Sequence, residues 1–183
     1  MRSAPRHRLP GDPMPAAEIA GMLRVDHAGE FGATRIYDGQ LEILRRGRGS
    51  GEIRRMAETE TRHLAAFETL LPKRRVRPTL LHPIWSVAGY ALGAATALLG
   101  DQAAMACTVA VEEVIDDHYR DQAERLGKQD PELSETVVAF RADEITHHDT
   151  AIAHGAEQTP GYELLTAVIK AGSRAAIWLS TRI

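Results

Sequence analysis

One arrangement of glutamates and histidines occurs twice along the chain and constrains its fold more than any other feature. A Glu-x-x-His motif begins at Glu60 and again at Glu144, and about thirty residues before each lies a glutamate among small or apolar residues, Glu30 and Glu112. On a helix, residues i and i+3 share a face, so each motif presents a carboxylate beside an imidazole. The near-equal spacing predicts two related pairs of helices.

The remainder of the chain also favours helices. No stretch alternates apolar and polar residues as a half-buried strand does, and Ala, Leu, Glu and Arg, which favour helices, dominate. Proline and glycine gather at a few places and divide the chain into long pieces. We predict an all-α protein with helices at 16–46, 52–71, 84–126 (a piece that Gly100 can interrupt), 131–156 and 161–181.

The repeated pattern matches a carboxylate-bridged two-metal site in a four-helix bundle. Such a site takes one glutamate from each of two helices and one Glu-x-x-His motif from each of the other two. Four buried carboxylates would be prohibitively unstable alone, whereas two divalent cations balance their charge. Oxygen and imidazole ligands with open positions suit iron or manganese. The predicted ligands are Glu30, Glu60, His63, Glu112, Glu144 and His147.

Composition narrows the range of functions. The 183 residues, 44% hydrophobic and 26% charged, suffice for one globular domain, which we place at 16–183 behind a mobile N-terminal tail at 1–15. A net charge of −3 and an aromatic content of 5% argue against a nucleic-acid partner. The single cysteine, Cys107, cannot form an intrachain disulfide and is expected to be an inert core thiol.

Residues 80–100 carry no formal charge, which is unusual in this chain. The stretch is just long enough to span a bilayer, but five alanines and three glycines make it weakly hydrophobic, so a helix lying on one leaflet is favoured. Gly89 and Gly93 form a GxxxG pattern that fits close packing in a soluble protein equally well. Basic clusters between residues 45 and 55 and between 73 and 77 suit either anionic headgroups or solvent.

Four stretches resemble the demethoxyubiquinone hydroxylases, the di-iron monooxygenases of ubiquinone biosynthesis. The most specific is LRVDHAGEFGA at 23–33, and the others lie at 60–63, 111–119 and 143–147. The resemblance runs from about residue 20 to the C-terminus and implies a ferritin-like four-helix bundle with additional apolar or amphipathic membrane-interfacial helices. It also implies two irons per chain, with Glu30 and His63 as terminal ligands of one, Glu112 and His147 of the other, and Glu60 and Glu144 as bridges.

The activity that this resemblance implies is O2-dependent hydroxylation of 5-demethoxyubiquinol (2-polyprenyl-3-methyl-6-methoxy-1,4-benzoquinol) to 3-demethylubiquinol. Two electrons must enter from outside, and the family is associated with NADH-linked or quinol-linked reduction. No Gly-x-Gly-x-x-Gly follows a strand, so no Rossmann site is expected. A polyprenyl substrate implies a peripheral membrane protein, on the cytoplasmic face of a bacterial inner membrane or the matrix side of the mitochondrial one. The 80–100 segment, and with it the 163–181 helix, would provide the membrane-facing surface and a channel to the irons. The family resemblance also implies a lipid-binding accessory protein as partner.

Residues beyond the six ligands are weaker predictions. Histidine ligands usually donate their second ring N–H to a carboxylate or carbonyl, and three aspartates lie near enough in helical position to accept it. A tyrosine seven residues after Glu112 shares its helix face, and a neighbouring histidine is matched by the resemblance. Exposed or merely packed side chains are the alternative for each. The candidates are Asp26, Asp116, Asp143, His118 and Tyr119.

Two other interpretations of the pattern are open at this point. A ferritin-like ferroxidase or a manganese catalase can use the same six ligands, but neither needs an apolar surface segment. A membrane-associated helical protein in which the pattern is accidental would bind no metal.

Overall fold

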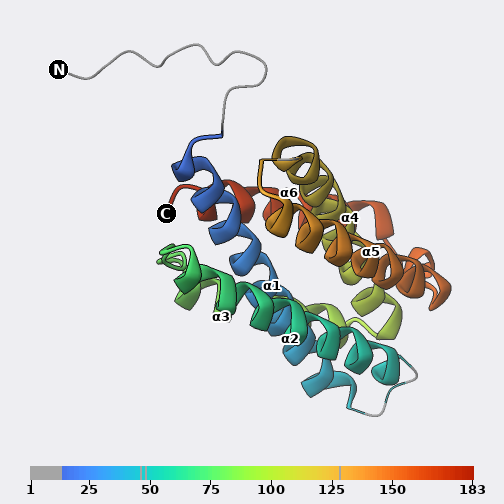
Figure 1. Ribbon diagram of the computed structural model, residues 1–183. Coiled ribbons are helices and arrows are strands. Elements are labelled where there is room, and N and C mark those ends of the chain that lie inside the picture. The colour runs from blue at the N-terminus through green and yellow to red at the C-terminus, as the bar shows by residue number, and fades with distance from the viewer. Residues whose placement is uncertain (1–13, 46, 48, 128) are drawn as a thin grey trace.

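The structure, a computed structural model, describes residues 14–45, 47, 49–127 and 129–183, and within them every regular element is helical (Figure 1). This confirms the all-α class. The elements are α1 (Ala16–Leu44), α2 (Ser50–Lys73), α3 (His82–Leu98), α4 (Asp101–Leu126), α5 (Pro131–Ala153), the short 3-10 helix η1 (Ala156–Gln158) and α6 (Tyr162–Ser180).

The predicted pieces correspond closely to these helices, and the differences have local causes. Gly100 adopts φ 115°, a backbone conformation that residues with a side chain rarely take, and it separates α3 from α4 as predicted. Asp130 caps α5 by accepting a hydrogen bond from the backbone N–H of Leu133, with Pro131 at the first helical position. The predicted tail lies outside the described residues except for positions 14 and 15, of which Met14 is buried.

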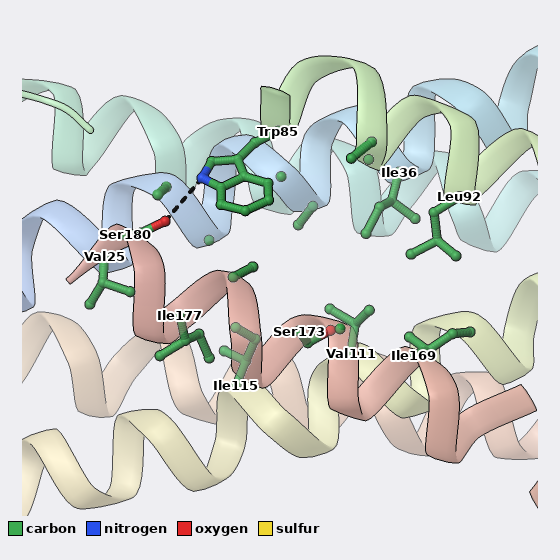
Figure 2. Close-up of a pocket in the computed structure, with 18 of the residues that line it drawn as sticks. Val25, Ile36, Trp85, Leu92, Val111, Ile115, Ile169, Ser173, Ile177 and Ser180 are labelled. Atoms are coloured by element: carbon green, nitrogen blue, oxygen red, sulfur yellow. Dashed lines mark hydrogen bonds between the residues drawn. The ribbon is translucent and has the colours of Figure 1, made fainter. Parts of the chain in front are cut away.

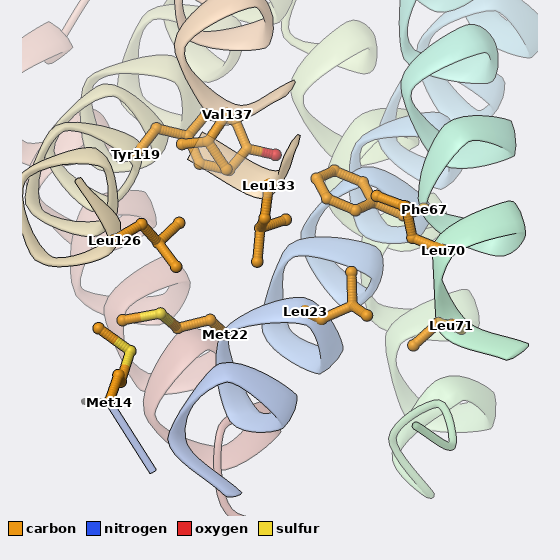
Figure 3. Packing of buried hydrophobic residues seen from close by; sticks show 10 residues of the cluster. All are labelled: Met14, Met22, Leu23, Phe67, Leu70, Leu71, Tyr119, Leu126, Leu133 and Val137. Atoms are coloured by element: carbon orange, nitrogen blue, oxygen red, sulfur yellow. The ribbon is translucent and has the colours of Figure 1, made fainter. Parts of the chain in front are cut away.

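Two clusters of buried apolar side chains lie along the helices α1, α2, α4 and α5. The Phe67 cluster, drawn in Figure 3, consists of Met14, Met22, Leu23, Phe67, Leu70, Leu71, Tyr119, Leu126, Leu133 and Val137. The Ile53 cluster consists of Tyr37, Ile53, Met56, Ala97, Ala104, Met105, Ala106, Val109, Ala151 and Ala156.

The order of these residues along each helix shows where a buried site lies. On α1, Leu23 of the Phe67 cluster precedes Glu30, and Tyr37 of the Ile53 cluster follows it. Along α5, residues of the Phe67 cluster again come before those of the Ile53 cluster. Along α2 and α4 the order is reversed, so these two helices run antiparallel to α1 and α5. The predicted ligands therefore occupy the middle of all four helices, between the two clusters.

Helix α3 packs on α1 so closely that side chains are excluded at the contact. A Cβ atom added to Gly93 would lie 1.9 Å from the carbonyl oxygen of Ile36, and one added to Gly89 would lie 2.9 Å from that of Gly32. Neither contact leaves room for a methyl group. The GxxxG pattern thus serves helix packing within this chain.

Helices α3 and α6 expose large apolar side chains to the surroundings. No helix in the described part of the chain is both long and apolar enough to cross a bilayer. The exposed apolar residues on or beside α3 are Leu80, Ile84, Val87, Leu98 and Leu99, and those on or beside α6 are Leu164, Val168, Trp178 and Ile183.

The basic run at the end of α2 is partly engaged within the protein. The guanidinium of Arg74 pairs with Asp130 and lies 2.7 Å from a carboxylate oxygen of Glu132. Arg74 therefore ties the end of α2 to the cap of α5. In the earlier basic cluster, Arg46 and Arg48 lie outside the described residues.

Candidate metal centre

The six predicted ligand side chains converge at the middle of the bundle, and none is more than 5% exposed. Their donor atoms form two groups of four, each with one atom per residue and all atoms within 4.8 Å of one another. Two glutamates belong to both groups, which is the arrangement that two bridging carboxylates require. The groups are Glu30, Glu60, His63 and Glu144, and Glu60, Glu112, Glu144 and His147.

Glu144 lies between the two imidazoles. Its Oε1 is 3.2 Å from Nδ1 of His63, and its Oε2 is 3.2 Å from Nδ1 of His147. On the other sides of these rings, Nδ1 of His63 is 3.6 Å from Glu30, and Nδ1 of His147 is 3.0 Å from Glu60 and 3.8 Å from Glu112. Both rings therefore turn the same nitrogen into the cluster.

The cluster is electrostatically strained without cations. Burial, together with Glu144, raises the pKa of Glu112 to about 8, and burial next to other carboxylates raises the pKa of Glu60 as well. Burial lowers the pKa of His63, but the adjacent carboxylates of Glu144 and Glu30 outweigh it and raise that pKa to about 10. Without cations, the folded protein therefore retains protons on Glu112 and His63 at pH values at which the unfolded chain would release them.

The donor atoms left over in the cluster fit a pair of metal ions. Among the described residues, buried polar atoms without a hydrogen-bond partner include Oε1 of Glu60, both carboxylate oxygens of Glu144, and Nδ1 of His63 and of His147. Buried polar atoms are nearly always partnered, so a concentration of unpartnered carboxylate oxygens and imidazole nitrogens in one place fits a site that binds cations. Oxygen and imidazole donors without a thiolate suit iron or manganese.

Two buried tyrosines, one on α1 and one on α4, each donate a hydrogen bond to the glutamate of the other helix. The hydroxyl of Tyr119 donates to Oε1 of Glu30, and that of Tyr37 donates to Oε1 of Glu112 at 3.0 Å. Each tyrosine follows one glutamate by seven residues and contacts the other. Tyr119 was among the sequence candidates, whereas Tyr37 was missed although it has the same spacing from Glu30.

Asp143 contacts one of the two predicted histidine ligands. Its Oδ2 lies 3.0 Å from Nε2 of His63, while the ring of His63 stacks on Phe140 with centroids 3.8 Å apart. These contacts fix the ring so that Nδ1 faces the carboxylates. This is the contact that the sequence predicted for an aspartate near a ligand.

The other candidates have different partners. Oδ1 of Asp26 lies 3.1 Å from Nε2 of His118 and accepts a hydrogen bond from Gln122 at 2.6 Å. This buried network lies one helical turn from Glu30. Asp116 instead pairs with Arg141 at 2.7 Å and links α4 to α5 at the surface, so its carboxylate is engaged away from the ligand histidines.

An apolar groove of about 410 Å³ runs beside the cluster, walled by α1, α3, α4 and α6. Figure 2 shows Trp85 at one end, donating a hydrogen bond to Ser180 at 3.0 Å, and Ile36, Leu92 and Val111 towards the other. Its wall is made of apolar side chains and glycines, apart from Ser173 and Ser180. The sequence predicted a channel at the 80–100 segment and the 163–181 helix, and both contribute to the groove, but the residues of α1 and α4 that complete its wall were missed because the four helices meet only in three dimensions.

Comparisons with known proteins give one family. The family model described as ubiquinone biosynthesis protein COQ7 matches residues 17–180. The chain is 54% identical over 183 residues to the 3-demethoxyubiquinol 3-hydroxylase of Rhodospirillum rubrum, covering 100% of this chain and 86% of that protein. It is 47% identical over 189 residues to the mitochondrial NADPH-dependent 3-demethoxyubiquinone 3-hydroxylase of Homo sapiens, covering 100% and 87%, respectively. The mitochondrial 5-demethoxyubiquinone hydroxylase of Saccharomyces cerevisiae is 40% identical over 185 residues, covering 92% and 79%.

Proposed function

The chain belongs to the COQ7 family of ubiquinone biosynthesis proteins, and we propose that it is a di-iron monooxygenase that hydroxylates 5-demethoxyubiquinol to 3-demethylubiquinol. The observation that carries this proposal is the pair of overlapping ligand groups that share Glu60 and Glu144 beside an apolar groove. The relatives named above are hydroxylases of this substrate class by name.

Two irons per chain fit the donor set. Glu30 and His63 would hold one, Glu112 and His147 the other, and Glu60 and Glu144 both, within a ferritin-like domain over 16–183. When bound, the irons supply the electrons that let O2 react with a closed-shell ring. The chain supplies ligand geometry through Asp143 and the two tyrosines.

The overall reaction must balance. One ring C–H bond is replaced by C–OH. One oxygen atom of O2 enters the product, and the other combines with two electrons and two protons to form water. The electron donor that we propose is a reduced nicotinamide. NADH-linked or quinol-linked reduction was the expectation from the family resemblance, and several relatives carry the term NADPH-dependent in their names.

The groove fits the polyprenyl part of the substrate. Its apolar wall excludes water and matches an isoprenoid chain, while the carboxylate cluster lies beyond the wall at one side. The exposed apolar side chains of α3 and α6 flank the same groove. We therefore propose that these two helices lie in the membrane interface and admit the substrate from the bilayer.

This arrangement implies a peripheral protein on the cytoplasmic face of a bacterial inner membrane, or on the matrix side of the mitochondrial inner membrane. The relatives include a protein of Rhodospirillum rubrum and several mitochondrial proteins. A lipid-binding accessory protein is proposed from the family resemblance alone.

The same ligands could serve a ferroxidase or a manganese catalase, but two observations favour the hydroxylase. Neither alternative uses a long apolar groove beside the metal ligands. The relatives covering most of this chain are named for hydroxylation. An accidental pattern without metal is disfavoured by the buried unpartnered donor atoms.

The deciding experiment measures iron content and turnover on one sample, with a short-chain demethoxyubiquinone, a reduced nicotinamide and air. About two irons per chain with hydroxylated product would support the proposal. Two irons without product would contradict the substrate and leave the ferroxidase as the better interpretation. Protein that binds no metal after reconstitution would contradict the ligand assignment.

A further inference from the structure

The two halves of the cluster have equivalent ligands but different surroundings. Along α1 and α4, each glutamate ligand is followed by a tyrosine after seven residues and by a glutamine after ten. These pairs are Tyr37 and Gln40 after Glu30, and Tyr119 and Gln122 after Glu112. Aligning Glu30 with Glu112 therefore sets a register in which the remaining positions of α1 and α4 can be compared one by one.

In this register the two halves differ at the positions that flank the ligands. Four residues before the glutamate stands Asp26 in one half and Thr108 in the other; six residues after it stand Ile36 and His118. Because the helices are antiparallel, Asp26 and His118 meet on the Glu30 side, where they lie 3.1 Å apart. Thr108 and Ile36 both line a small void on the opposite side.

The Glu112 side contains free space where the Glu30 side contains the polar pair. A void of about 10 Å³ is lined by Ala33, Ile36, Tyr37, Thr108, Val111 and Glu112. Three of these residues, Ala33, Ile36 and Val111, also line the large groove. Among the described residues, Glu112 is the one predicted ligand that lines either space, and it lines the void, so the free space nearest the cluster that joins the groove lies on its side.

We propose that the quinol ring reacts on the Glu112 side, at the junction formed by Ala33, Ile36 and Val111, and that Tyr37 is the positioning residue of that half. This inference rests on the proposed function and adds the side from which the substrate reaches the metals. The void holds about one water molecule, so the ring sits at the junction and pushes Ile36 and Val111 aside rather than filling the void.

The polar groups at the junction suit a quinol. Tyr37 donates to Glu112, so a ring in this place lies next to a carboxylate whose orientation is fixed from the opposite half. The hydroxyl of Thr108 makes a long 3.4 Å contact with the carbonyl of Ala104 and can turn towards a ring oxygen. The Asp26–His118 pair closes the Glu30 side to an apolar ligand.

A matched pair of variants tests the location. Ala33→Leu fills the junction, whereas Ala65→Leu adds the same atoms to the exposed face of α2, away from both the groove and the void. Iron-loaded full-length proteins are titrated with a short-chain quinone, and the change in the electron paramagnetic resonance of the partly reduced metal centre is followed. Iron content and melting temperature are measured on the same samples.

We expect wild type and Ala65→Leu to respond at similar quinone concentrations, while Ala33→Leu needs about tenfold more, since overpacking a site costs on the order of 1–3 kcal/mol. A response of Ala33→Leu equal to that of Ala65→Leu, at two irons in both, would overturn the inference. Ile36→Ala widens the junction and should restore the response in the Ala33→Leu background.

The tyrosines provide a second matched pair, because Tyr37→Phe and Tyr119→Phe each remove one hydrogen bond to a terminal carboxylate. We expect both to change the spectrum of the iron-loaded protein, and Tyr37→Phe alone to change the quinone titration. Equal shifts in the two variants would contradict the assignment. A wild-type protein that binds iron but neither responds to quinone nor forms product would instead contradict the proposed function, and this inference with it.

Discussion

The hydroxyl of Tyr37 lies 3.0 Å from Oε1 of Glu112, although Tyr37 belongs to the helix that carries Glu30. The reciprocal hydrogen bond is also present, because the hydroxyl of Tyr119, on the helix that carries Glu112, donates to Glu30. Glu30 and Glu112, the proposed terminal ligands, are therefore each oriented by the other half of the protein. Neither half of the sequence repeat could form this site alone, which explains why both copies must fold into one bundle.

Removing either shared glutamate should be more damaging than removing any neighbouring acid. Glu60 and Glu144 belong to both ligand groups, so Glu60→Ala or Glu144→Ala removes a donor to both metals. We expect hydroxylation to fall by at least about 100-fold and iron content to drop below two per chain. Glu113→Ala, beside a ligand but paired with Lys170, is the control. Product formation retained in either bridge variant would contradict the assignment.

Without metal, the protein should lose stability as the pH rises. Burial raises the pKa of Glu112 from 4.5 to about 8, and the carboxylates around His63, against the effect of burial, raise its pKa from 6.5 to about 10. The folded state therefore holds protons that the unfolded chain releases, so stability declines from about pH 4.5 to 8 for Glu112 and from about pH 6.5 to 10 for His63.

The measurement is urea unfolding with a chelator at several pH values. We expect the free energy of unfolding to fall by at least about 1 kcal/mol per pH unit between about pH 6 and about pH 8. Metal-loaded protein is the comparison, because cations replace the protons and should remove this decline. A metal-free protein that becomes more stable over the same interval would show that these groups do not govern its stability.

The helices and all six clustered residues were predictable from the sequence because both depend on local spacing. Periodicity and the Pro/Gly clusters marked the helix ends, and the repeat marked the six residues that the structure brings together. Tyr37 was equally available from spacing, since it stands seven residues after Glu30 as Tyr119 does after Glu112. The full lining of the groove could not be predicted from spacing, because its wall combines small residues of α1 with apolar residues of α3, α4 and α6, and only packing brings them together.

Asp143 should matter for metal affinity although it is not a predicted ligand. It lies 3.0 Å from Nε2 of His63 and fixes the ring. We expect Asp143→Asn to weaken iron binding by about 10- to 100-fold, as is usual for groups that orient a ligand. Asp149→Asn, on the exposed face of the same helix, is the control. Competition with a chelator of known affinity measures the change, and equal affinities in the two variants would argue against the role.

Arg74 should stabilise the fold rather than bind lipid. Its guanidinium engages Asp130, the residue that caps α5, and also Glu132. We expect Arg74→Ala to lower the free energy of unfolding by about 1–2 kcal/mol through loss of this partly buried pair, with little effect on binding to anionic vesicles. Lys73→Ala, one residue earlier, should show the smaller loss of stability. A large drop in vesicle binding by Arg74→Ala alone would reverse this conclusion.

The apolar surfaces of α3 and α6 should govern attachment to membranes. Val87 is 71% exposed and Leu164 is 73% exposed, and neither lines the groove, so a charge there leaves the substrate site intact. We expect Val87→Glu or Leu164→Glu to weaken co-sedimentation with vesicles by about tenfold, because a carboxylate must leave water to enter the interface. Val138→Glu is the matched control, since Val138 is 53% exposed on α5. If all three variants bind equally well, α3 and α6 are not the membrane-facing helices, and the substrate must reach the groove by another route.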